Sequence, residues 1–398
     1  MARRESSIGP GSRALVVDHI RSAGPVSRAD LAVATGLTQP SISNIVRRLL
    51  VERIVVEDGK TTVGTRPSKL LSINAYALYA IGMHVSDAEV TCVATDMNAG
   101  MVARQRTSRT AGNSERLSSE LVDVYGQFVH LLGTDEMEIA GLSVVVPSGA
   151  RSRVDLGSLR LELERSIGHK VLVEHAALAA TMGEYWSRQI SREESLACVF
   201  IDESIESGIV LGGGPWRGSR NSAGRLGHIS IDRNGPVCEC GSRGCLDLYA
   251  SPRAIVNAAR AIPKLSTGLD LRLERATISD DFDLIGRAAV NGHPEASSLF
   301  GRAAQDLGQA VVSMNALVDL SSIVVTGPAS AVPGSLFVRA IRESLNSAGA
   351  GILAGNVSLS ESPRDSAAIG AAAMVLQSSV SPGHYTALGS TRLASASA

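Results

Sequence analysis

Aromatic residues are scarce in this sequence and make up only 3% of its 398 positions. Its cores must therefore be built mainly from alanine, valine, leucine and isoleucine. Runs of about 18 uncharged apolar residues are also lacking, so no membrane-spanning helix is expected. The first residues, MARRESSIGPGSR, lack the apolar segment of a secretory signal. We therefore expect a cytoplasmic protein, and a chain of this length should form two or three domains.

Cysteine is scarce as well, with five residues in the whole chain. Three of them are clustered at Cys238, Cys240 and Cys245, shortly after His228. Such short spacings, with glycine and proline between them, suit a tight metal-binding loop better than a disulfide framework. Three thiolates and one imidazole would complete the tetrahedron that zinc prefers and leave no position for a substrate. We therefore expect a structural zinc ion on these four residues; reduced cysteines that bind no metal are the alternative.

A strong excess of charge is also absent, because the formal net charge is −1. The charges are nevertheless unevenly distributed along the chain. Residues 1–72 contain 11 lysines and arginines against 6 acidic residues, or +5, which leaves −6 for the remainder. A basic head attached to an acidic body is typical of a protein whose head meets a polyanion.

Residues 12–75 show the pattern of a helix-turn-helix domain. The spacing of apolar residues predicts helices over 12–22, 28–35 and 39–51. Gly36 lies between the second and third of these helices, where the motif has a short turn that often contains glycine. The head is therefore predicted to be a three-helix domain.

The predicted third helix has one apolar and one polar face. Ile42, Ile45, Val46 and Leu49 are spaced to pack inward. On the other face, amide side chains can pair with adenine edges, and arginine can pair with guanine or hold phosphate. A merely solvated surface is the alternative, but the three-helix setting favours DNA recognition. The polar face consists of Gln39, Ser41, Ser43, Asn44, Arg47 and Arg48.

Two β-prone runs, 54–60 and 65–73, follow the third helix. Asp58-Gly59 is a turn dipeptide and is predicted to separate them. Arg66-Pro67 is an extended basic step suited to a minor groove, where arginine is favoured. We therefore predict a winged helix-turn-helix that binds duplex DNA. Contacts with phosphate or the minor groove are expected from Arg48, Lys60, Arg66 and Lys69.

From residue 76 to residue 380 short apolar runs alternate with helical patterns, which indicates an α/β fold with helices covering mixed sheets. Residues 381–398 are rich in small polar residues and are expected to be disordered, and residues 1–11 to form a flexible arm. Strands are predicted near 80–85, 90–96, 101–107, 139–147, 170–175, 196–202, 207–213 and 321–327, and helices near 114–132, 159–167, 177–187 and 365–376.

Together, the winged head and the cysteine cluster resemble the ROK family, named for repressors, open reading frames and kinases. The most specific match is Gly227-His228 followed by the CxCGxxGC run over 238–245, and residues 369–373 match the family's final Gly-Ala-Ala helix. The resemblance covers roughly residues 12–380. It implies a two-lobed actin-like ATPase fold, with sugar and ATP between the lobes in the kinase members. Members with a winged head are transcription regulators, usually sugar-responsive repressors.

The sequence departs from the kinase members of the family at the catalytic positions. Their glycine-rich phosphate turn is replaced by the non-glycine residues 83–88, and Glu206 stands where the family has glycine. Ala176 stands at the position of the catalytic aspartate, and alanine cannot accept a proton from a sugar hydroxyl. Because phosphoryl transfer depends on positioning and electrostatic stabilisation, we expect no kinase activity.

The resemblance also implies a set of effector-binding residues, several of which are altered. Arg225 stands where the family has its first carboxylate, and Asp247 takes the place of the family's last glutamate. Gly227-His228 is kept. Arg225 and His175 would suit an anionic sugar derivative. The imidazole of His228 would serve the metal, the sugar or both, with one ring nitrogen for each. The expected effector-binding residues are Glu174, His175, Arg225, His228 and Asp247.

We therefore expect a DNA-binding transcriptional repressor whose kinase-like body has lost catalysis and senses a sugar or sugar derivative. A single winged head offers few contacts, so a homodimer or a dimer of dimers on a palindromic operator is expected. Two alternatives remain. One is a DNA-bound regulator whose body docks a protein partner and senses no small molecule, and the other is an ATP-dependent sugar kinase.

Overall fold

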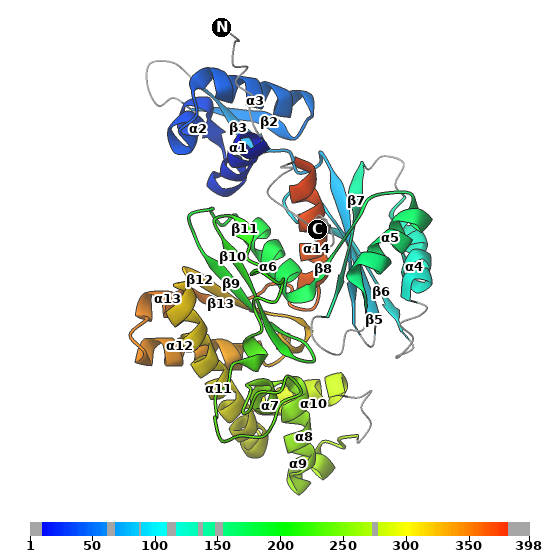
Figure 1. Cartoon of the computed structure of the whole chain (residues 1–398), viewed down its shortest axis with the longest axis vertical. Helices are drawn as coiled ribbons and strands as arrows, with labels where there is room; N and C mark the ends of the chain where they lie inside the picture. Colours follow the sequence, from blue (N-terminus) through cyan, green and yellow to red (C-terminus); the bar gives the residue numbers. More distant parts are fainter. Residues whose placement is uncertain are drawn as a thin grey trace, which may run out of the picture.

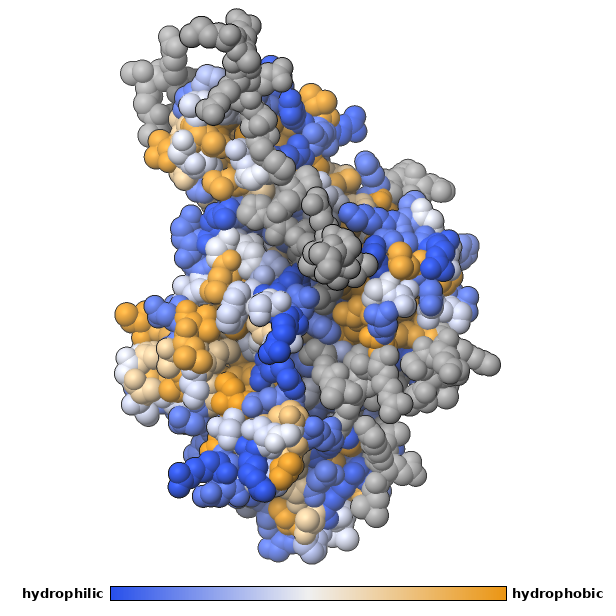
Figure 2. All heavy atoms as spheres, in the orientation of Figure 1, coloured by the Kyte–Doolittle hydropathy of each residue, from blue (hydrophilic) through white to orange (hydrophobic). Residues whose placement is uncertain are grey.

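The computed structural model describes residues 10–61, 68–86, 89–109, 117–133, 138–147, 154–272 and 278–380. Within these ranges a small N-terminal head stands on a larger body made of two lobes (Figure 1). In the face drawn in Figure 2, hydrophilic residues gather where the two lobes meet. None of the helices in the described ranges is long and apolar enough to cross a membrane.

The head combines three helices with a small antiparallel sheet. Helices α1 (Pro10–Ala23), α2 (Arg28–Thr35) and α3 (Gln39–Val51) surround a core to which α3 contributes the predicted apolar face. Ser27 and Asp30 form a capping box at the start of α2, each side chain bonding the other residue's backbone amide. The sheet has the strand order β1-β3-β2, from β1 (Val26–Ser27), β2 (Val55–Thr61) and β3 (Ser68–Ile73).

The predicted turn at Asp58-Gly59 is wrong, because both residues lie inside β2. Glu57 pairs with Leu71 and Lys60 with Lys69, so two residues of β2 stand opposite one residue of β3. This is a β-bulge, and Gly59 has the φ of +76° that glycine tolerates. The connection between the strands falls in 62–67, outside the described residues.

The ends of the head also differ slightly from the prediction. Helix α1 begins at Pro10, two residues before the predicted start, so the expected arm over 1–11 is shortened. Residues 1–9 and 381–398 lie outside the described residues. A short segment, 74–78, joins β3 to the body and carries the exposed Tyr76.

The first lobe is built on a five-stranded sheet in the order β6-β5-β4-β7-β8. Strands β4 (Tyr79–Val85), β5 (Glu89–Thr95) and β6 (Met101–Ser108) form an antiparallel meander. Strands β7 (Ile139–Val146) and β8 (Val171–His175) continue the sheet in parallel with β4. Helices α4 (Leu117–Leu132) and α5 (Leu156–Ile167) complete the lobe.

The second lobe repeats this topology in the order β11-β10-β9-β12-β13. Strands β9 (Leu196–Ile201), β10 (Ile205–Leu211) and β11 (Gly214–Pro215) are antiparallel, whereas β12 (Ser322–Thr326) and β13 (Val357–Leu359) run parallel to β9. Every strand and helix predicted for the body is present, with its ends shifted by four residues or fewer.

Helices α6 (Ala176–Ser187) and α14 (Ser366–Val380) pack against each other between the two sheets. Their contact is close because it is lined by glycine: a Cβ on Gly370 would lie 1.8 Å from the carbonyl oxygen of Ala179. The head, α6 and α14 share one apolar cluster, and each lobe has a further cluster of its own.

The remaining helices belong to the second lobe and its lower part in Figure 1. The longest of them, α11, packs mainly against α12 and α10. These elements are η3 (Leu226–His228), α7 (Asp247–Ala250), α8 (Pro252–Arg260), α9 (Pro263–Gly268), α10 (Ile278–Val290), α11 (Pro294–Val318), η5 (Pro328–Ser330), α12 (Gly334–Ser347) and α13 (Gly351–Gly355).

Candidate functional site

The outer face of α3 presents the polar side chains that the sequence predicts for DNA recognition. Gln39, Ser43, Asn44 and the two arginines Arg47 and Arg48 are exposed. A guanidinium nitrogen of Arg47 donates to Oδ1 of Asn44 at 2.6 Å, so these side chains are aligned along the helix. Ser41 is half-buried, and its hydroxyl lies 3.0 Å from that of Thr38, the residue that caps α3. The helix therefore offers a continuous row of donors and acceptors.

The wing beside α3 carries a small ion-pair network centred on Glu57. Lys69 forms an ion pair with this carboxylate, and Arg28 approaches it at 2.8 Å. Hydrogen bonds from Lys69 and Arg28 hold the pKa of Glu57 below its usual value. Lys69, predicted to contact phosphate, is thus already paired with an acid. Lys60 lies on β2 but its side chain is outside the described residues, as is Arg66.

A shallow groove runs along this side of the head. It is lined by Arg28, Ser43, Arg47, Leu50 and Val51. Arg28 comes from the start of α2 and had not been predicted, because nothing in its local sequence separates it from a surface arginine. The groove combines two guanidinium groups with an exposed apolar edge, a composition that suits an anionic backbone beside base methyl groups.

The four predicted metal ligands lie together in the second lobe. Nδ1 of His228 is 3.6 Å from Sγ of Cys238, and Sγ of Cys240 is 3.6 Å from Sγ of Cys245. All four ligand atoms lie within 4.8 Å of one another. The turn is held tightly by Gly244, where a Cβ would lie 1.7 Å from the carbonyl oxygen of Asp232.

The chemistry of this cluster fits a soft metal ion. Burial raises the pKa of Cys245 to about 12, so its thiol would stay protonated if no cation balanced the charge. A cation placed among the sulfurs would supply that balance and favour the thiolates. Because Nδ1 of His228 faces the sulfurs, Nε2 is the ring nitrogen left for another partner. The site can therefore hold a tetrahedral metal ion.

The predicted effector residue Glu174 is fully buried at the end of β8 and forms an ion pair with Arg217. One of its oxygens also accepts a hydrogen bond from the backbone amide of His175 at 3.0 Å. His175 is half-buried, and burial lowers the pKa of its imidazole. It precedes Ala176, the first residue of α6. No local sequence pattern predicts Arg217 as the partner of Glu174, because it lies 43 residues away in the loop after β11.

The other predicted effector residues lie in the second lobe. Oδ1 of Asp247 accepts a hydrogen bond from the backbone amide of Ile205 at 2.9 Å, which fixes the start of β10. The carboxylate of Asp247 also packs against Gly227, the neighbour of His228. Arg225 is exposed at the start of η3. The loop that carries Arg217 leads to this region. The backbone carbonyl oxygen of Arg217 accepts a hydrogen bond from the amide of Ala223 at 3.1 Å.

A family model for the ROK family matches residues 80–378, three quarters of the chain. The chain belongs to the ROK family. It is 28% identical over 262 residues to the xylose repressor of Bacillus subtilis, covering 63% of this chain and 68% of that protein. It is 24% identical over 318 residues to the Escherichia coli DNA-binding transcriptional dual regulator NagC, covering 76% of this chain and 77% of that protein.

Two solved ROK structures show how the fold is shared. A ROK family transcriptional regulator, a homologue of the E. coli Mlc protein, matches with a TM-score of 0.71 and 21% identity over 94% of this chain and 98% of its own. A ROK glucokinase from Streptomyces griseus, solved with glucose and AMPPNP, matches with a TM-score of 0.59 and 24% identity. The match covers 74% of this chain and 98% of the glucokinase chain. The two-lobed actin-like fold is therefore confirmed.

Within this ROK fold, His84 belongs to the run that the family resemblance places at the kinase members' phosphate turn. His84 on β4 is only 3% exposed, and its ring meets that of Phe200 edge-on at 6.2 Å. Its Nε2 lies 4.0 Å from Oδ2 of Asp202. Ala176, which the family resemblance places at the position of the catalytic aspartate, is the buried first residue of α6.

Proposed function

We propose that this protein is a DNA-binding transcriptional repressor whose ROK body senses a sugar or sugar derivative and does not phosphorylate it. The observation that carries the proposal is the exposed polar row of α3 in a head joined to a ROK body. The resemblance adds that Ala176, at the start of α6, takes the place of the kinase members' catalytic aspartate. Relatives named as a xylose repressor and as the regulator NagC support it. Such a protein acts on DNA in the cytoplasm.

In the proposed complex, α3 enters the major groove of a palindromic operator. Gln39, Ser43, Asn44 and Arg47 face base edges, because they form the outermost row of the helix. Arg48, Lys60, Arg66 and Lys69 then serve phosphates or the minor groove. Two heads of a homodimer, or four of a dimer of dimers, supply the contacts that a single head lacks.

The test of DNA recognition has two steps. DNA fragments recovered with the purified protein are sequenced to define a preferred site. A duplex carrying that site is then titrated with wild type and with Arg47→Ala. Loss of a base contact is expected to weaken binding at that site by about 1–3 kcal/mol while leaving random DNA almost unaffected. Arg160→Ala, in α5 of the body, is the matched control. Equal weakening on both DNAs would assign Arg47 to phosphate, and failure to recover any preferred site would remove the proposal.

We also propose that the metal in the cysteine cluster is zinc with a structural role. Purified protein is expected to contain about one zinc ion per chain by elemental analysis, and Cys240→Ser to lose it and unfold at a lower temperature. Cys92→Ala removes a buried cysteine outside the cluster and should retain the metal. Wild-type protein without stoichiometric metal would refute the assignment.

The proposed effector site comprises Glu174, His175, Arg225, His228 and Asp247, with Arg217 added by the structure. Four of these six carry basic side chains and two carry carboxylates, which favours an anionic sugar derivative. Thermal-shift measurements with xylose, N-acetylglucosamine and their phosphates test this class. Stronger stabilisation by the neutral sugars would contradict the anionic assignment, and no stabilisation by any of them would favour the rival proposal of a protein partner.

A further inference from the structure

Helix α1 of the head reaches into the body with two arginines, Arg13 and Arg21, about two turns apart. Nε of Arg13 donates to the carbonyl oxygen of Val380 at 2.8 Å. The guanidinium of Arg21 donates to the carbonyl oxygens of Tyr185 at 3.0 Å and Trp186 at 3.3 Å. The first carbonyl belongs to the end of α14 and the other two to the end of α6.

These bonds make each arginine the C-terminal cap of a body helix. The last carbonyl groups of a helix have no partner within it and carry partial negative charge, so a guanidinium group stabilises them. Arg21 also donates to the carbonyl oxygen of Ile190 at 2.6 Å, just beyond α6. The head thus holds the body through the ends of its two central helices.

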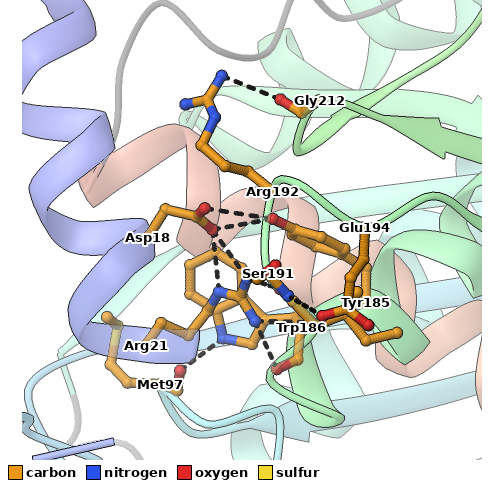
Figure 3. A network of polar contacts seen from close by, with 10 residues as sticks. Asp18, Arg21, Met97, Tyr185, Trp186, Ser191, Arg192, Glu194 and Gly212 are labelled. Atoms are coloured by element: carbon orange, nitrogen blue, oxygen red, sulfur yellow. Dashed lines mark hydrogen bonds and ion pairs between the residues drawn. The ribbon is translucent and has the colours of Figure 1, made fainter. Parts of the chain in front are cut away.

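The guanidinium of Arg21 is buried and surrounded by groups that stabilise a positive charge (Figure 3). Arg21 is 3% exposed, and Asp18 from the same helix lies 2.8 Å away as its counter-ion. Its guanidinium lies 4.4 Å from the ring centroid of Tyr185, whose hydroxyl donates to Asp18 at 3.0 Å. Trp186 is fixed in turn through its indole nitrogen, which donates to the carbonyl oxygen of Met97 at 2.7 Å. A buried charge with this many partners is costly to displace.

The opposite end of α6 lies at the effector residues. Helix α6 begins at Ala176, directly after Glu174 and His175. Helix α14 packs along α6 through the glycine contacts, and a Cβ on Gly183 would lie 2.8 Å from Cα of Gly370. Because backbones in such close contact cannot slide independently, the two helices should move as one body.

Arg13 continues this connection to the DNA-reading helix. Two of its guanidinium nitrogens donate to the carboxylate of Glu52, at 3.0 Å and 2.5 Å. Glu52 is the C-terminal cap residue of α3. One side chain therefore joins the end of α14 to the end of α3.

We propose that Arg13 and Arg21 are positioning residues that transmit a change at the effector residues to the recognition helix. This inference rests on the proposed function. A ligand that displaces the start of α6 moves the α6–α14 pair as a unit, and the pair moves α1 and α3 through the two capped helix ends. Loss of both arginines uncouples the head from the body while leaving each intact.

The first experiment measures this coupling in the full-length protein without DNA or ligand. Wild type is expected to unfold in one calorimetric transition, and Arg13→Met/Arg21→Met in two. Tyr76 is exposed, but its segment is held by the bond from the amide of Met97 to the carbonyl oxygen of Ala75. In the double variant, chymotrypsin cleavage at Tyr76 should accelerate about fivefold or more. A single transition and unchanged cleavage in the double variant would overturn the proposal.

Two further variants guard against general damage. Arg342→Met removes an arginine of α12 whose bonds, to the carbonyl oxygen of Val357, stay within the second lobe, and should behave as wild type. Arg21→Lys keeps the charge but makes fewer bonds, and should cleave at an intermediate rate. If Arg342→Met uncoupled the domains as strongly as the double variant, the role of the two α1 arginines would be refuted.

The second experiment tests transmission. Arg217→Met disturbs the start of α6 by removing the partner of Glu174, and hydrogen exchange of the α1 amides is compared with wild type. Their exchange should change by at least about fivefold with the arginines in place and remain unchanged in the Arg13→Met/Arg21→Met background. No change in the first background, or equal change in both, would refute transmission. Neither experiment uses DNA. Failure of the proposed function would instead appear in the DNA-recovery experiment, as wild-type protein that selects no preferred site.

Discussion

Buried titratable side chains give this protein a predictable response to acid, and His84 is the clearest case. Burial lowers the pKa of its imidazole from 6.5 to about 4, against a weaker opposing effect of Asp365. The unfolded chain therefore takes up a proton at this residue below about pH 6.5, whereas the folded protein resists until about pH 4. Since the unfolded state binds more protons in this window, the free energy of unfolding should fall as the pH decreases, by up to roughly 3 kcal/mol.

Urea unfolding of wild type and His84→Gln at pH 7, 6, 5 and 4.5 measures this contribution. The variant should lose part of the decline with falling pH, because glutamine takes up no proton in this range. His130→Gln, at an exposed position near the end of α4, should keep the wild-type profile. The same decline in all three proteins would place the acid sensitivity elsewhere.

Ala176 provides a test of whether the body can be made to phosphorylate a sugar. Ala176→Asp places a carboxylate at the start of α6, while the buried His84 stays in the run that the resemblance assigns to the phosphate turn. Because proton abstraction without phosphate binding is insufficient, no ATP-dependent phosphorylation of glucose is expected. The assay is release of ADP with and without glucose, and sugar-dependent ADP release would show that the body had retained a working nucleotide site.

At the scale of elements, α6 packs closely against α14 through glycine, and Gly370→Ala tests this contact. The added methyl group would meet the carbonyl oxygen of Ala179 at 1.8 Å, so the helices must separate. We expect a loss of about 1–3 kcal/mol in the free energy of unfolding, measured in urea at pH 7. Gly126→Ala is the matched control, because nothing lies within 4 Å of its added methyl group on α4.

The control should change stability in the opposite direction. Alanine is a better helix former than glycine, so Gly126→Ala is expected to gain about 0.5–1 kcal/mol. If Gly370→Ala cost no more than its control, the close contact between the two helices would not constrain their motion. The proposed transmission through this pair would then lose its mechanical basis.

At the scale of the whole molecule, the uneven charge predicts a strong dependence of DNA binding on salt. A dimer with several phosphate contacts per head should lose about 10³-fold or more in affinity between 50 and 200 mM potassium chloride. Fluorescence anisotropy with a labelled duplex measures this change. A nearly flat dependence would mean that the basic head makes few phosphate contacts.

The sequence predicted the elements of the body and the clustering of His228 with the three cysteines, because both produce local signals: apolar periodicity and short cysteine spacing. It did not reveal Arg28, Arg217, Arg13 or Arg21 as partners of distant groups. Their bonds connect residues up to 367 positions apart, and no local pattern marks which surface-like arginine will be buried. The bulge at Asp58-Gly59 was misjudged for a related reason, since a glycine with positive φ serves a turn and a bulge equally well.

The bond between Arg13 and the carbonyl oxygen of Val380 also has a consequence for biosynthesis. A ribosome makes the head first, and domains generally fold in that order as the chain emerges. The end of α14 is among the last parts of the body to be made, so a nascent head can fold long before its partner exists. During that interval, and in any product truncated before α14, the head would lack this bond to the body. Synthesis of α14 is thus the step that completes the attachment of the head.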